Sequence, residues 1–266
     1  MADVVNSLFI KQDGKFYDLY DLPDGFVIKG DLNLSGKGLT KLPDLSKVIV
    51  EGSFLCESNQ LTSLQGAPQK VGGSFLCENN QLTSLQGAPQ EVGGDFRCSY
   101  NQLTSLQGAS QKVGGVFQCS NNQLTSLQGA PQEVGGDFWC HENQLTSLEG
   151  APQEVGGDFR CENNQLTSLQ GISKEIGGKI KVDINISAQY GFNGGEIKLD
   201  DLKNLPLYRE EIFISEKSKE LRRKVMRTIA AENVSPEKGV VKPKRTAGEK
   251  KAIKKILDGI GNNIEK

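Results

Sequence analysis

The chain has 266 residues, enough for one large domain or two small ones, and only 36% of them are hydrophobic. It has no stretch near the roughly 18 apolar residues of a membrane span, and no basic start followed by an apolar run, so we expect neither a membrane helix nor a cleavable signal peptide. The net charge of -2 is unevenly spread along the chain. From Ser215 onward, 15 basic and 7 acidic residues give +8, and the 16 basic and 26 acidic residues before Ser215 give -10. The charge therefore indicates an acidic body and a basic tail.

The first predicted element is a β-hairpin over the segment FIKQDGKFY. Asp13-Gly14 is flanked by apolar residues in this segment, and Asp-Gly is a favoured two-residue hairpin turn. We expect the hairpin to belong to an N-terminal cap, residues 1–29, which covers the open edge of the first strand behind it.

A 21-residue repeat follows, and six cysteines mark it: Cys56, Cys77, Cys98, Cys119, Cys140 and Cys161. One copy, from Gly73, is GSFLCENNQLTSLQGAPQEVG. Phe75 and Cys77 are two residues apart, so both point to one side of a strand. A single copy cannot bury its few apolar side chains, whereas stacked copies can, with neighbouring strands paired in parallel at about 4.8 Å. The period therefore predicts a solenoid rather than disorder.

The frame F-x-C-x-x-N-x-L-x-x-L resembles the leucine-rich-repeat signature, and the NQLTSL segment is similar to the short repeats of bacterial and phage proteins of that class. The resemblance covers residues 30–187. It implies a leucine-rich-repeat solenoid, an α/β or mainly β horseshoe with about eight parallel strands on the concave side and irregular or short helical turns on the convex side. It also implies a ladder of inward asparagines that bond to neighbouring backbone: Asn59, Asn80, Asn101, Asn122, Asn143 and Asn164.

The two ends of the array are degraded copies, as is typical of terminal repeats in a solenoid. The first, from Asp31, has Lys37 in the asparagine position. The last, from Lys179, keeps Asn185 in that position but has Ser187 where the leucine belongs.

Residues 188–232 are predicted to form a C-terminal cap, with a helix from Ser215 that seals the core. Residues 233–266 are predicted to be a basic linker and a terminal helix opened by the capping box of Thr246 and Glu249. The polar face of that helix carries Lys250, Lys251, Lys254 and Lys255. Such a face can dock on nucleic acid or an anionic membrane, or it can be a solvated face whose apolar stripe packs elsewhere.

The cysteines and the single histidine are the residues that suggest chemistry. Parallel cysteine side chains do not suit disulfide geometry, and the spacing is not that of a zinc site, so we interpret the cysteines as buried hydrophobes in a reducing, cytoplasmic compartment. Export without a cleaved signal is the alternative. His141 follows Cys140 and should face the opposite way, which predicts an exposed residue rather than a Cys/His pair.

Some similar repeat proteins carry a ubiquitin-ligase domain with a catalytic cysteine, but here no cysteine follows Cys161. We expect no enzymatic activity, catalytic residue, metal, cofactor or small-molecule substrate.

The copies differ from one another mainly at strand positions that should face solvent, whereas LTSLQGAP is nearly unchanged. Random drift would alter the exposed turn positions as well, so selection for a specific surface is the favoured explanation. Trp139, the sole tryptophan, is either part of that surface or core filler. The candidate partner-binding residues are Leu55, Leu76, Arg97, Tyr100, Gln118, Trp139, His141 and Arg160. The leading hypothesis is a non-catalytic module that binds a protein or peptide on the concave face. The alternatives are nucleic-acid or membrane association through the tail, and a spacer or shell component.

Overall fold

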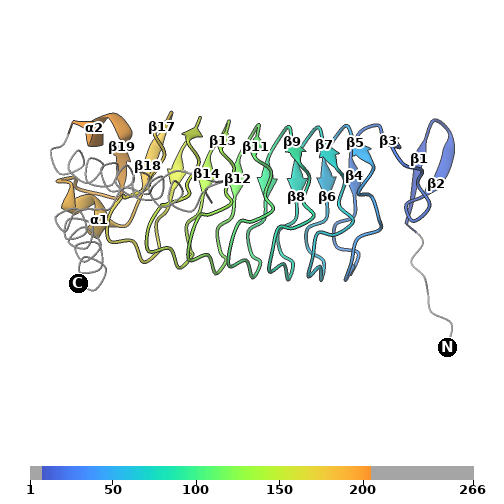
Figure 1. The fold of residues 1–266 in the computed structure, drawn as a ribbon, viewed down its shortest axis with the longest axis horizontal. Coiled ribbons are helices and arrows are strands. Elements are labelled where there is room, and N and C mark those ends of the chain that lie inside the picture. Colours follow the sequence, from blue (N-terminus) through green and yellow to red (C-terminus); the bar gives the residue numbers. More distant parts are fainter. Residues whose placement is uncertain (1–7, 205–266) are drawn as a thin grey trace, which may run out of the picture. The chain divides into compact units, whose positions relative to one another are not determined.

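The computed structural model describes residues 8–204 of the chain. They form a parallel β-solenoid of about seven turns with a period near 21 residues, preceded by an antiparallel hairpin (Figure 1). The helix predicted from Ser215 and the lysine-bearing terminal helix lie outside the described residues.

The N-terminal hairpin consists of β1 (Phe9–Gln12) and β2 (Lys15–Asp18), paired antiparallel. Asp13 and Gly14 connect them with φ angles of 50° and 78°, the left-handed conformations that a tight hairpin turn requires. The predicted hairpin is therefore confirmed.

The side chain of Gln12 bonds to the first strand of the solenoid, β3 (Val27–Ile28). Its Nε2 donates to the carbonyl oxygen of Val27 at 3.0 Å, and its Oε1 accepts from the backbone N–H of Lys29 at 2.8 Å. One amide side chain thus takes the place of a neighbouring strand along this edge, which helps to close it against further strand pairing.

Each turn of the solenoid contributes one short strand to each of two parallel sheets. The first sheet contains β4 (Leu32–Asn33), β6 (Phe54–Leu55), β8 (Phe75–Leu76), β10 (Phe96–Arg97), β12 (Phe117–Gln118), β14 (Phe138–Trp139), β16 (Phe159–Arg160) and β18 (Lys179–Lys181), with β19 (Glu196–Lys198) antiparallel at its end. The second contains β3, β5 (Ile49–Val50), β7 (Lys70–Val71), β9 (Glu91–Val92), β11 (Lys112–Val113), β13 (Glu133–Val134), β15 (Glu154–Val155) and β17 (Glu175–Ile176). The sequence predicted about eight parallel strands, and the first sheet has that number. It did not predict the second sheet.

The core lies between the sheets and is built mainly from one phenylalanine, one cysteine and two leucines per copy, with a buried valine from most strands of the second sheet. In the copy around Cys98, the residues Phe96, Cys98, Leu103 and Leu106 are all 0% exposed. The phenylalanine rings follow one another along the stack with centroids 5.1 to 5.7 Å apart. Because each ring covers the next, the core is continuous and no single copy has to bury its side chains alone.

A glycine pair forms the corner between the two sheets in each turn. The N–H of Gly93 donates to the Val71 carbonyl oxygen in the preceding turn at 3.0 Å. A Cβ on Gly93 would lie 2.1 Å from the carbonyl oxygen of Gly72. The close approach of successive backbones therefore requires glycine here, independently of any special φ angle.

The C-terminal end of the array departs from the repeat. It contains α1 (Ile184–Gln189), the antiparallel strand β19 and α2 (Leu199–Lys203), and neither helix is long and apolar enough to cross a membrane. Asn185, which occupies the asparagine position of the degraded last copy, is exposed on α1, because the chain turns into a helix at this copy. Asp183 accepts from the backbone N–H of Asn163 at 2.9 Å, and Tyr190 accepts from that of Leu169 at 3.2 Å. These two side chains connect the last turn to the array.

Candidate interaction surface

One column of half-buried side chains runs along the outer face of the nine-stranded sheet. Each member directly follows a buried phenylalanine, and the strands pair in register, so consecutive members lie side by side. The column consists of Leu55, Leu76, Arg97, Gln118, Trp139 and Arg160, followed by Lys181. The structure thus places six of the eight predicted surface residues in one row. Trp139 is among them and lies outside the core.

Trp139 is the centre of a compact cluster near the C-terminal end of this column. The guanidinium group of Arg160 lies 5.3 Å from the centroid of the Trp139 ring, within range of a cation–π interaction. Arg160 Nε also donates to Glu162 Oε1 at 3.0 Å, and the two side chains form an ion pair. The His141 ring is tilted against Trp139 at a centroid distance of 6.3 Å. The neighbours therefore hold the indole in one arrangement.

His141 is half-buried rather than exposed, because Trp139 and the adjacent turn cover part of the ring. This corrects the prediction from strand alternation. Its opposition to Cys140 is as predicted, since Cys140 is 0% exposed. Burial lowers the pKa of His141 and Arg160 lowers it further, while Glu162 acts in the opposite direction. The neutral imidazole is consequently favoured.

The position after each cysteine is not uniformly solvent-facing, contrary to the prediction. Ser99 and Ser120 occupy it in two neighbouring copies and are 1% and 0% exposed. Their hydroxyl oxygens lie 2.9 Å apart and share a hydrogen bond, and Gln118 Nε2 donates to Ser120 at 3.3 Å. Two short hydroxyl side chains, Ser99 and Ser120, therefore occupy the middle of the outer face of the nine-stranded sheet.

The next position, which includes Tyr100, was predicted to lie on a strand but forms a tight turn. All six copies have a left-handed backbone there, with φ from 54° to 57°: Ser58, Asn79, Tyr100, Asn121, Glu142 and Asn163. Asparagine adopts this conformation at low cost, whereas a bulky side chain is strained in it. Tyr100 nevertheless occupies it with its side chain 57% exposed.

We expect Tyr100→Asn to raise the free energy of unfolding by about 1 kcal/mol, because it relieves left-handed strain without removing core contacts. Urea unfolding of the two proteins measures the difference. The reverse substitution in the next copy, Asn121→Tyr, should lower the free energy by a similar amount. Equal stability of all three proteins would show that the position carries no strain.

The six asparagines join successive turns below this surface. Asn101 Nδ2 donates to the carbonyl oxygens of Cys77 and Cys98 at 3.0 and 3.1 Å, and its Oδ1 accepts from the N–H of Leu82 at 3.0 Å. The same bonding between turns recurs at Asn59, Asn80, Asn122, Asn143 and Asn164. In the degraded first copy, the backbone N–H of Lys37 donates to Asn59 Oδ1 at 3.0 Å. These amides fix the turn that follows each outer strand.

The six cysteine thiols are free and buried in the core. Cys77 Sγ donates to the carbonyl oxygen of Arg97 at 3.3 Å, and Cys140 Sγ to that of Arg160 at 3.3 Å. Burial raises the pKa of each thiol, which disfavours the reactive thiolate. Among residues 8–204, no three or more His, Cys, Asp or Glu side chains are placed to hold a metal ion.

No model of a known protein family, no curated protein and no solved structure matches this chain.

Several polar atoms on the outer face are shielded from solvent and have no hydrogen-bond partner within residues 8–204. They are Glu57 Oε2, Glu78 Oε2, Arg97 Nε, Trp139 Nε1, His141 Nδ1 and Glu162 Oε2. Unpaired buried polar atoms are costly, and most folded proteins have few. Here they are concentrated on one face, and sequence periodicity gave no sign of them.

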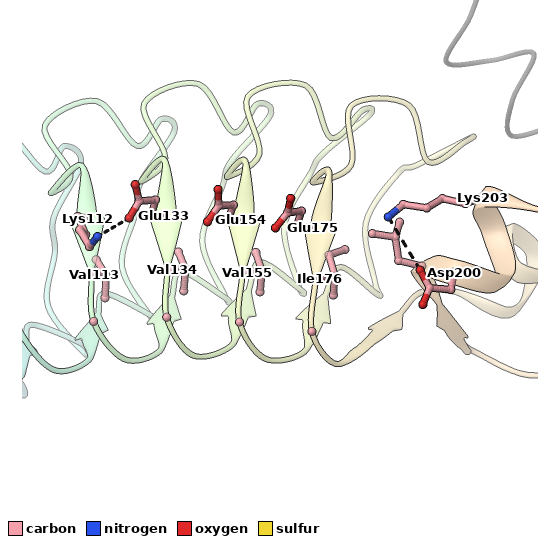
Figure 2. Close-up of a pocket in the computed structure, with 15 residues that line it drawn as sticks. Lys112, Val113, Glu133, Val134, Glu154, Val155, Glu175, Ile176, Asp200 and Lys203 are labelled. Carbon is pink, nitrogen blue, oxygen red and sulfur yellow. Dashed lines mark hydrogen bonds and ion pairs between the residues drawn. The ribbon is translucent and has the colours of Figure 1, made fainter.

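A second surface lies over the eight-stranded sheet, where Figure 2 shows a groove lined by one charged residue and one inward aliphatic residue per turn. Lys112 forms an ion pair with Glu133, and Glu154 and Glu175 continue the row. Lys70 and Glu91 pair in the same way at 2.5 Å in earlier turns. Water screens ion pairs between exposed side chains, so these pairs support the register of the turns only weakly.

Proposed function

We propose that residues 30–187 are a leucine-rich-repeat module with short repeats, and that it binds a protein or peptide partner on the outer face of the nine-stranded sheet without catalysing a reaction. Two features support the repeat type. Leucines fill the two inward positions after each asparagine, and each asparagine bonds to backbone in its own turn and the preceding one. The buried thiols with raised pKa values support a non-catalytic role.

The observation that carries the proposal is that the copies differ most in the chemistry of this face, whereas the exposed position of the second sheet varies only between lysine and glutamate. The exposed threonines of the turns are the same in every copy: Thr62, Thr83, Thr104, Thr125, Thr146 and Thr167. The outer column, in contrast, changes from leucine to arginine, glutamine and tryptophan while the backbone stays the same. Drift would have altered both sets. A strained Tyr100 beside this column agrees with a surface kept for its contacts, since strained residues cluster at functional sites.

The chemistry of the column suits protein recognition. Tryptophan, tyrosine and arginine supply most of the binding energy in protein interfaces. Arg160 already contacts the Trp139 ring and pairs with Glu162 before any partner arrives. A partner therefore has fewer side-chain conformations to immobilise, and less of the contact energy is lost on binding.

The proposal is tested by selecting phage-displayed random dodecapeptides on the immobilised full-length chain and measuring the affinity of enriched peptides by fluorescence polarisation. The double variant Trp139→Ala with Arg160→Ala should bind them roughly 30-fold more weakly, the effect of losing about 2 kcal/mol at a central contact.

The matched control is Gln144→Ala with Thr146→Ala, which alters exposed side chains of the same turn away from the column and should leave the affinity unchanged. Urea unfolding establishes that all three proteins fold. Failure to enrich any peptide, or unchanged affinity of the Trp139/Arg160 variant, would contradict the proposal. Peptides held by the basic tail would bind both variants equally and lose affinity with rising salt.

A further inference from the structure

The outer column is chemically polarised along the solenoid. Its first two members are leucines, Leu55 and Leu76, and each is followed two residues later by a glutamate, Glu57 or Glu78. Trp139 and Arg160 lie further along the same row. The N-terminal end of the surface thus combines an aliphatic platform with two carboxylates, which is a different chemistry from the aromatic and cationic end.

The two glutamates form a like-charged pair on neighbouring turns. Leu55 and Leu76 are partners in the sheet register, which places Glu57 and Glu78 one strand spacing, about 4.8 Å, apart. Their Oε2 atoms are both shielded from solvent and lack a hydrogen-bond partner within the described residues. Burial raises the pKa of Glu78, its own backbone N–H lowers it by a hydrogen bond, and the neighbouring Glu57 raises it. Each of the two carboxylates thus keeps one oxygen without a donor among the described residues.

The nearest cation of the column does not satisfy this pair. Arg97 follows Leu76 in the row, but its guanidinium group contacts Asp95, two residues before it, at 2.6 Å, and among the described residues it forms no ion pair with Glu78. The charge of Arg97 lowers the pKa of Glu78, and the charge of Asp95 raises it. A cation supplied by a partner would therefore find both carboxylates available.

The half-buried leucines beside the pair suit the aliphatic part of a basic side chain. Lysine and arginine commonly lay their methylene groups on apolar surface while the charged end reaches a carboxylate. Leu55 and Leu76 lie side by side in the row and precede the two glutamates by two residues. The methylene groups of a basic side chain could therefore contact the leucines while its charged group reaches a glutamate.

We infer that the partner segment is an extended peptide that lies along the column and places a lysine or arginine over Leu55, Leu76 and the Glu57–Glu78 pair, with its hydrophobic anchor at Trp139. This inference rests on the proposed function. Four strand steps separate β6 from β14, roughly 19 Å at about 4.8 Å per step, which an extended chain spans with about six residues. The basic residue and the anchor should therefore be about six positions apart.

The test repeats the dodecapeptide selection on the wild-type chain and on the charge-reversed variant Glu57→Lys with Glu78→Lys. Wild-type protein should enrich peptides with lysine or arginine about six residues from an aromatic or large aliphatic residue. The reversed variant should enrich aspartate or glutamate at the same position. The matched control, Glu133→Lys with Glu154→Lys, makes the same change in net charge on the other sheet and should keep the basic preference (Figure 2).

A second measurement covers the case in which the reversed variant does not fold. In Glu57→Gln with Glu78→Gln, replacing the basic residue of a selected peptide by alanine should change affinity less than twofold, against roughly tenfold on wild-type protein. Enriched peptides without a basic preference, or a preference that the glutamate variants leave unchanged, would overturn the inference and leave the proposed function standing. Failure of the wild-type chain to enrich any peptide would overturn both.

Discussion

Gly114→Ala should lower the free energy of unfolding by roughly 3–5 kcal/mol, because the added methyl group meets backbone rather than a movable side chain. Its Cβ would lie 2.0 Å from the carbonyl oxygen of Gly93 and 3.0 Å from the carbonyl carbon. The two turns would have to separate, which weakens the hydrogen bond from the Gly114 N–H to the Val92 carbonyl oxygen at 3.2 Å and its neighbours. Urea unfolding followed by circular dichroism measures the loss.

Gly38→Ala is the matched control, since that glycine has a φ of 68° but no atom within 4 Å of an added Cβ. It should cost only the backbone strain, about 1–2 kcal/mol. Equal losses in the two variants would show that the turns separate easily and that the glycine corner is not set by close approach. The same backbone contact recurs at Gly72, Gly93, Gly135, Gly156 and Gly177.

The strands that precede these glycines were not predictable from the sequence. The strong signals were Phe75 and Cys77 at alternate positions and the exact recurrence of the cysteines, and they were enough to predict a stacked parallel sheet with a buried core. The glycine pairs, such as Gly93-Gly94, mark the corner between the sheets in the sequence, but they do not reveal the strand that precedes them. Each strand of the second sheet is two residues long with one inward valine or isoleucine, such as Glu91–Val92, too short to show an alternating pattern.

The candidate surface was predictable in its members but not in its details. In-register stacking follows from an exact period, and it places Arg97, Gln118 and Trp139 in one row. The left-handed backbone at Tyr100 depends on the turn after each strand, and the asparagines at the equivalent positions were its one available sign in the sequence. Trp139 lies two residues before His141 and covers part of its ring; strand alternation predicts that the two side chains share a face, but not how closely their rings pack.

The asparagine ladder shows how the surface depends on what lies beneath it. Asn101→Leu should destabilise the protein by about 1–3 kcal/mol, because the apolar side chain leaves the N–H of Leu82 without an acceptor and removes one of the two amide donors to the carbonyl oxygen of Cys77. Gln102→Leu, one residue along at an exposed position, should change stability by no more than about 0.5 kcal/mol. Thermal and urea unfolding compare the three proteins.

Leucine is larger in apolar area than asparagine, so a gain in burial opposes the loss of these bonds, and the sign of the measured change decides between them. A loss means that the amide is required to join the turn of Tyr100 to the preceding copy, since it bonds to both. An Asn101→Leu protein as stable as wild type would mean that packing alone holds the turns together. The buried phenylalanines and cysteines would then determine the shape of the outer face. The backbone conformation of the left-handed turn could then differ between copies according to the residue at that position.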